Sequence, residues 1–145
     1  MSYIPPAYAS IYVAGAAITM DPADFTVYTQ LTGFTALGPS YNCSGDFANN
    51  KISVSLLGDY LVNCGLSFSG TPSSTFTVKP YYVGLPAPGI QSAQRVSAVG
   101  DTSFIACNGL VACTGIGDIT VYAAGDGAGD TMLIKDLILT AAKVG

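Results

Sequence analysis

The stretch NNKISVSLLGDYLVNCGLSFSG, residues 49–70, decides the class of fold. It consists of two runs of alternating apolar and polar residues, separated by Gly58-Asp59, and a period of two is typical of a strand with one buried face. The second run has a wholly apolar face, made of Tyr60, Val62, Cys64, Leu66 and Phe68. Its opposite face is almost as poor in charge, with Leu61, Asn63, Gly65 and Ser67. The stretch therefore predicts two strands and raises the question of what covers that second face.

The composition favours a single all-β domain. Of the 145 residues only 10% are charged, against about 25% in an ordinary soluble domain. Every acidic residue is Asp, and Glu, His and Trp are absent, whereas Gly, Ser, Thr, Val and Tyr suit strands and turns. The net charge of −4, with five scattered basic residues, argues against a nucleic-acid partner, which requires a basic patch.

Half of the residues are hydrophobic, so a soluble chain with so few charges has apolar surface to cover. An obligate interface between identical subunits would cover it, because such interfaces are apolar and poor in charge. A monomer with a neutral surface of Ser, Thr and Asn is the alternative.

The first 20 residues carry no charged side chain, but they also lack a basic start, and Pro5-Pro6 interrupts any apolar helix. We therefore expect no secretory signal. No run reaches the ~18 apolar residues of a membrane helix, so no membrane insertion is expected. We expect residues 1–8 to form an extended arm that docks on a neighbouring subunit or is disordered, and residues 9–145 to form one domain. The interface candidates in the arm are Tyr3, Ile4, Pro5, Pro6 and Tyr8.

Turn signals rich in Gly, Pro, Asn and Asp divide the chain into short strands. Nine strands with this spacing are typical of a β-sandwich or a barrel. The last of them alternates in a way that suggests burial on both faces near its end. The predicted strands are Ala9–Ala14, Phe25–Thr29, Lys51–Leu57, Tyr60–Ser69, Thr75–Val83, Arg95–Val99, Thr102–Ala112, Ile119–Ala124 and Met132–Ala142.

The four cysteines form no recognisable site. There is no C-x-x-C pair and no His, so a zinc site is not expected. We interpret the cysteines as reduced, small apolar residues, which is consistent with assembly in a cytoplasm. Cys64 shares the apolar face of its strand, Cys107 and Cys113 share parity, and Cys43 lies in a loop-like segment rich in Gly, Asn and Ser.

Catalysis and cofactors are not expected. With no His or Glu, no base stands beside a plausible nucleophile. Asp126 and Asp130 lie in the glycine-rich segment GDGAGD, where they are weak candidates for calcium ligands or for a carboxylate pair of a glycan hydrolase. A hairpin turn explains the same glycines. The chain is therefore predicted not to be an enzyme.

Tyrosine is abundant and is a favoured contact residue at binding surfaces. Tyr81 and Tyr82, followed by Leu85 in VGLPAPG, are candidates for a binding site at a loop tip. Packing within a strand, with the hydroxyl group reaching water, is the alternative.

Three segments in order resemble the jelly-roll domain of the tumour-necrosis-factor (TNF) and C1q family. They are FANNKISV leading into GDYLVNCGLSFSG at 47–70, VACTGIGDITVY at 111–122 and DLILTAAKVG at 136–145. The resemblance implies a two-sheet antiparallel jelly-roll β-sandwich of about 8–10 strands. It also implies a homotrimer in which the neutral face of the strand 60–69, with Leu61 and Asn63, or a neighbouring strand of its sheet lies against another subunit.

The sequence departs from secreted members of that family, since it shows no collagen-like stalk and no evident signal. Its richness in Tyr, Asn and Ser and its short N-terminal arm with Pro5-Pro6 resemble instead the stand-alone domains of tailed-bacteriophage structural proteins. This second resemblance implies a capsid decoration (cement) protein, made in the host cytoplasm and bound to the major capsid protein on the outer surface of the virion. The alternative is the receptor-binding head of a tail fibre, which contacts a glycan or protein on the host surface.

Overall fold

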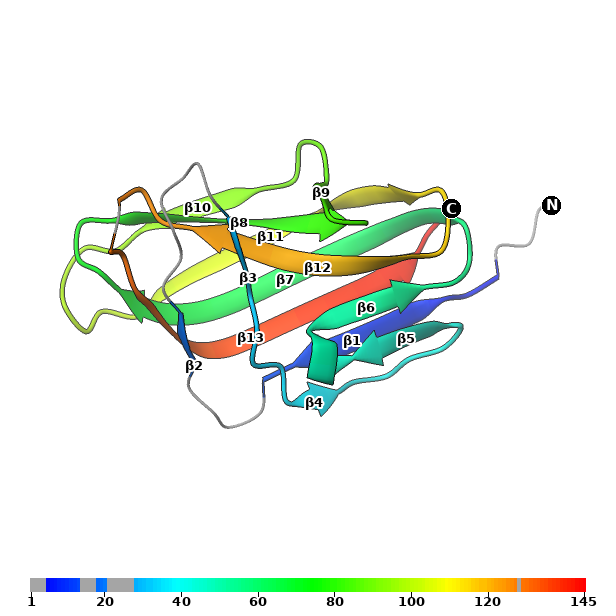
Figure 1. The fold of residues 1–145 in the computed structure, drawn as a ribbon, viewed down its shortest axis with the longest axis horizontal. Coiled ribbons are helices and arrows are strands. Elements are labelled where there is room, and N and C mark those ends of the chain that lie inside the picture. The colour runs from blue at the N-terminus through cyan, green and yellow to red at the C-terminus, as the bar shows by residue number, and fades with distance from the viewer. Residues whose placement is uncertain (1–4, 14–17, 21–27, 128) are drawn as a thin grey trace.

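The computed structural model describes residues 5–13, 18–20, 28–127 and 129–145, and in it the chain folds into two antiparallel sheets packed face to face (Figure 1). We call them sheet A and sheet B. The strands of sheet A are, in spatial order, β11 (Ser103–Cys113), β7 (Gly58–Gly70), β13 (Met132–Lys143), β1 (Tyr8–Tyr12) and β4 (Ala36–Leu37), with β2 (Ile18–Met20) also paired to β13.

Sheet B carries the other strands, and β10, β11, β12 and β13 lie alternately in sheets B and A. This alternation wraps the chain around one core, as in a jelly roll. The strands of sheet B are β10 (Ser92–Arg95), β8 (Thr75–Tyr82), β12 (Gly117–Ala124), β6 (Lys51–Val54) and β5 (Cys43–Asp46), with β3 (Thr29–Gln30) on β12 and β9 (Leu85–Pro86) on β8. The predicted fold class is confirmed.

The inner faces of both sheets supply the core. Tyr60 and Phe68 of β7 are fully buried, together with Phe76 of β8, and the rings of Phe68 and Phe76 meet edge to face with their centroids 5.4 Å apart. The Tyr60 hydroxyl group donates a hydrogen bond to the carbonyl oxygen of Leu56 at 2.9 Å. The inward face predicted for β7 from the period of two is therefore correct.

The Asn-rich turn before β6 is a single turn of 3₁₀ helix, Phe47–Asn49. Asp46 caps it by accepting a hydrogen bond from the Asn49 amide at 3.1 Å. Asn50 ends it in the left-handed conformation, at a φ of 58°, which Asn tolerates better than most residues. Its side-chain oxygen accepts a hydrogen bond from the Gly33 amide at 2.9 Å and so ties a distant loop to this turn.

Strand β13 corrects one prediction. Its pairing with β7 shifts register between Ile134 and Asp136, which marks a β-bulge. An extra residue reverses the alternation beyond it, so the strand keeps one buried face instead of two. The inward residues are Met132, Ile134, Leu137, Leu139 and Ala141.

Other boundaries also differ from the prediction. The strand expected at Arg95–Val99 is wrong beyond its first residue, because the strand observed here, β10, begins at Ser92 and ends at Arg95. The segment around Cys43, expected to be loop-like, contains β5. The strand expected at Lys51–Leu57 stops at Val54. Residues 25–27 of the strand expected at Phe25–Thr29 lie outside the described residues. In the described part of the chain no helix is both long enough and apolar enough to cross a membrane.

Candidate functional site

The outer surface of sheet A is the candidate site, and we call it the A face. Because β11, β7, β13 and β1 pair in register, their outward side chains line up in rows that cross the sheet, and β1 contributes to three of the four. The four rows are Phe104–Ser67–Asp136, Ala106–Gly65–Ile138–Tyr12, Asn108–Asn63–Thr140–Ser10 and Leu110–Leu61–Ala142–Tyr8.

In these four rows the only charged side chain is Asp136, and just beyond them Asp59, opposite Ala112, and Lys135, at the bulge of β13, are exposed. Large apolar side chains are left open to solvent on them: Phe104 is 69% exposed and Ile138 is 44% exposed. An open, contiguous surface of this kind marks a site of interaction, whereas a single exposed apolar residue does not.

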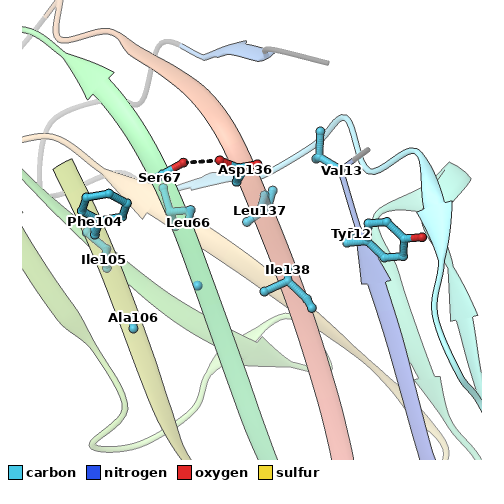
Figure 2. Close-up of a pocket in the computed structure, with 11 residues that line it drawn as sticks. Tyr12, Val13, Leu66, Ser67, Phe104, Ile105, Ala106, Asp136, Leu137 and Ile138 are labelled. Carbon is cyan, nitrogen blue, oxygen red and sulfur yellow. Dashed lines mark hydrogen bonds between the residues drawn. The ribbon is translucent and has the colours of Figure 1, made fainter. Parts of the chain in front are cut away.

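The A face is hollowed by a groove of about 500 Å³ (Figure 2). Gly65 forms part of its floor, and a Cβ atom built there would meet only the Cγ2 atom of Ile138, at 3.8 Å. The Asp136 carboxylate lies at the groove and accepts a hydrogen bond from the Ser67 hydroxyl group at 2.7 Å. The groove is therefore mainly apolar, with one satisfied carboxylate beside it.

The predicted interface residues are brought together only in part. Leu61 and Asn63 lie on the A face, as does Tyr8, whose ring stacks on that of Tyr41 with centroids 6.2 Å apart. Pro5 and Pro6 are exposed, and Tyr3 and Ile4 lie outside the described residues. Sequence reasoning missed Tyr12 and Phe104, although the period of two in their strands was a usable signal. It also missed Ile138, whose parity is reversed by the bulge in β13.

The three residues predicted at a loop tip do not converge. Tyr81 lies within β8 and stacks on Tyr122 of β12, with ring centroids 3.9 Å apart. The Tyr82 hydroxyl group instead donates a hydrogen bond to the Gly115 carbonyl oxygen. Leu85 is exposed in β9. The Tyr81–Tyr122 pair is a surface feature of sheet B, where the Lys79 Nζ atom also lies 4.0 Å from the centre of the Tyr28 ring.

Asp126 and Asp130 do not form a carboxylate pair open to a ligand. Asp130 is buried, and its oxygens accept hydrogen bonds from the Ser74 hydroxyl group at 2.7 Å and from the Gly127 amide at 3.1 Å. Asp126 is exposed. The described residues contain no group of three or more His, Cys, Asp or Glu side chains that could hold a metal ion. The arrangement is that of a turn braced by one carboxylate.

Burial also suppresses ionisation of several groups in the core. It raises the pKa of the Cys43 and Cys113 thiols to about 11 and that of Tyr60 to about 12. A thiol acts as a nucleophile in its ionised form, so the raised pKa values of Cys43 and Cys113 disfavour reaction of these thiols at neutral pH.

No protein-family model matches the sequence, and a search of curated proteins found no match. Solved structures share its fold. The TNF protein Eiger of S. frugiperda superposes with a TM-score of 0.65 at 12% identity, over 98% of this chain and 94% of that one. The globular domain of zebrafish complement 1qA superposes with a TM-score of 0.66 at 10% identity, over 95% of this chain and 96% of that one. Murine APRIL superposes with a TM-score of 0.61 at 11% identity, over 97% of this chain and all of that one (100%). The fold is therefore a TNF/C1q-like jelly roll.

Proposed function

We propose that the chain is a non-enzymatic structural protein that assembles as a homotrimer through the A face. The observation that carries this proposal is the combination of four in-register rows, one charged side chain and an open apolar groove. A second copy suits such a surface, because interfaces between identical subunits are apolar and depleted of charge at their centre. A cyclic arrangement closes the assembly at a finite size.

A second surface stays free when the A face is covered. It lies where the turns β6–β7, β8–β9 and β11–β12 meet at one end of the sandwich. Two contacts support this arrangement: the Val83 amide donates a hydrogen bond to the Asp118 carbonyl oxygen, and Gly58 pairs with Cys113. We call this surface the turn end. Its exposed aliphatic side chains are Leu57, Val83, Leu85 and Ile116.

We further propose that the protein is a bacteriophage capsid decoration (cement) protein on the outer virion surface. The turn end would contact the major capsid protein, and residues 1–6, in which Pro5 and Pro6 are exposed, would add to the attachment. Its mechanism would be mass action: a protein that binds only the assembled shell favours that shell over its dissociated subunits. Three copies of the turn end in one trimer would strengthen attachment through their effective concentration.

The receptor-binding head of a tail fibre is the second candidate. It is supported by the aromatic surface of sheet B, because the stacked rings of Tyr81 and Tyr122 lie beside the Lys79–Tyr28 pair. Rigid aromatic rings with polar edges are favoured contact groups for glycans and proteins.

Immunogold electron microscopy of particles from the source of this chain separates the two candidates. Gold over the capsid supports the decoration role, and gold at the tail tip supports the fibre head. Particles without label would contradict both. Rebinding to stripped particles then tests the surface: Ile116→Asp should lose attachment, and Tyr81→Ala should keep it.

A further inference from the structure

Two thiols face each other inside the sandwich on neighbouring strands. Cys64 of β7 and Cys107 of β11 are direct partners in the register of these two antiparallel strands. Both side chains point into the core, where Cys64 is 2% exposed and Cys107 is 6% exposed. Both are free thiols.

The pairing of the two strands brings the two backbones within the Cα separation that a disulfide spans. Directly opposed residues in an antiparallel pair have Cα atoms about 4.5 or 5.5 Å apart, depending on whether the pair is hydrogen-bonded. Disulfides span Cα separations of about 4.4–6.8 Å, so either kind of pair lies within reach of the bond. No change of strand register is required.

The other two cysteines are placed differently. Cys43 lies in β5 of sheet B and Cys113 at the end of β11 in sheet A, so no strand register pairs them. The Cys43 thiol donates a hydrogen bond to the Ser53 carbonyl oxygen at 3.3 Å. The four cysteines therefore consist of one cross-strand pair and two thiols that serve as internal controls.

We propose that Cys64 and Cys107 form an oxidisable dithiol, whose product is a disulfide that joins the edge strand β11 to its neighbour β7. The oxidant is a small peroxide. The Cys107 thiolate attacks one peroxide oxygen, the O–O bond breaks, and Cys107 sulfenic acid and hydroxide form. The Cys64 sulfur then displaces the sulfenic oxygen as water and forms the S–S bond. In total, two thiols lose two electrons and two protons, and one hydrogen peroxide becomes two waters.

The order of these steps follows from the local chemistry. The hydrogen bond from the Cys64 thiol lowers the pKa of Cys107, because it favours the ionised sulfur there. The same hydrogen bond, together with burial, raises the pKa of Cys64. Cys107 is also the more exposed of the two and lies on an edge strand, where local opening admits a small oxidant. Cys107 therefore reacts first and Cys64 resolves the product.

Whether the disulfide forms would depend on the redox state of the compartment that holds the protein. In a reducing cytoplasm the pair stays as thiols, and in an oxidising environment it closes. The crosslink encloses a loop of about 40 residues, which restricts the unfolded chain and should raise the melting temperature by about 10 °C if the bond is unstrained.

The test uses the folded full-length protein and hydrogen peroxide. After brief exposure, free thiols are alkylated under denaturing conditions, and the chain is digested without reductant and mapped by mass spectrometry. We expect one crosslink, between the peptides that carry Cys64 and Cys107, which disappears on reduction. Cys43→Ala should retain the crosslink, and Cys64→Ala and Cys107→Ala should each lose it.

Three results would overturn the proposal: a crosslink between Cys43 and Cys113 in its place, Cys107 oxidised to the sulfinic acid with Cys64 still free, or both thiols unmodified while Cys43 is oxidised. The mapping is done on the natural sequence, so it decides the matter even where a Cys→Ala variant fails to fold. Thermal melting of the oxidised and reduced protein provides a second readout.

Discussion

Replacing Ile138 with Asp should abolish the proposed trimer and leave a folded monomer. Ile138 lies at the centre of the A face, between Gly65 and Tyr12 in its row, and projects into the groove (Figure 2). Its side chain is outside the core, so the sandwich itself should fold. The change leaves the inward face of β13 untouched.

The expected magnitude follows from its exposure. Full burial of an Ile side chain contributes ~1.5–3 kcal/mol. Ile138 is 44% exposed, so covering this exposed part in the interface contributes about 1 kcal/mol per subunit. Placing a carboxylate in the same apolar contact adds a desolvation penalty of several kcal/mol. A loss of about 4 kcal/mol per subunit is about 12 kcal/mol per trimer, which weakens trimer formation by about nine orders of magnitude.

Sedimentation velocity at micromolar protein concentration measures this directly, and circular dichroism checks that the variant is folded. Ile116→Asp is the matched control, because it makes the same exchange at a side chain that is 84% exposed in the β11–β12 turn. The control should sediment like the unaltered protein. A folded Ile138→Asp protein that still sediments as a trimer would refute the assignment of the A face, and so would a monomeric Ile116→Asp protein.

Three further predictions concern the core and the turns. Phe68→Ala should lower the free energy of unfolding by ~3–5 kcal/mol through loss of a fully buried ring, which urea titration measures; a loss below 1 kcal/mol would contradict the described packing. Asp130→Ala should lower the free energy of unfolding by about 2 kcal/mol, because the buried hydroxyl group of Ser74 loses its acceptor. Neither calcium nor a chelator should change the melting temperature of the unaltered protein. A clear upward shift with calcium would show that the turn binds the ion. Burial raises the pKa of Tyr60 from 10.0 to about 12, so its contribution to stability is complete below pH 10 and is lost as the pH rises towards 12. Tyr60→Phe should therefore reduce the loss of stability at alkaline pH. An unchanged dependence of stability on pH would show that other groups cause the loss.

The sequence was informative wherever one strand revealed its own faces. The alternation in residues 60–68 predicted both the buried side of β7 and the neutral side that lies on the A face. The inventory of strand and turn residues, with the resemblance of three segments, was enough to predict the two-sheet jelly roll. These signals are local, because side chains alternate along a strand whatever its neighbours are.

The remaining features depend on pairing between distant segments. The bulge in β13 reverses the parity of Asp136 and Ile138, and it is defined by the register against β7 and not by any local signal. Strand β5, with its polar sequence CSGD, becomes a strand by pairing with β6. The opposition of Cys64 and Cys107 likewise requires the register of two strands that lie far apart in the sequence.

The central claim, self-association through the A face, is tested most directly by the mass of the full-length protein in solution. Sedimentation equilibrium over a range of micromolar concentrations should give three times the 14.8 kDa mass of the chain. A single species of 14.8 kDa at every concentration would contradict the account and would leave the A face exposed.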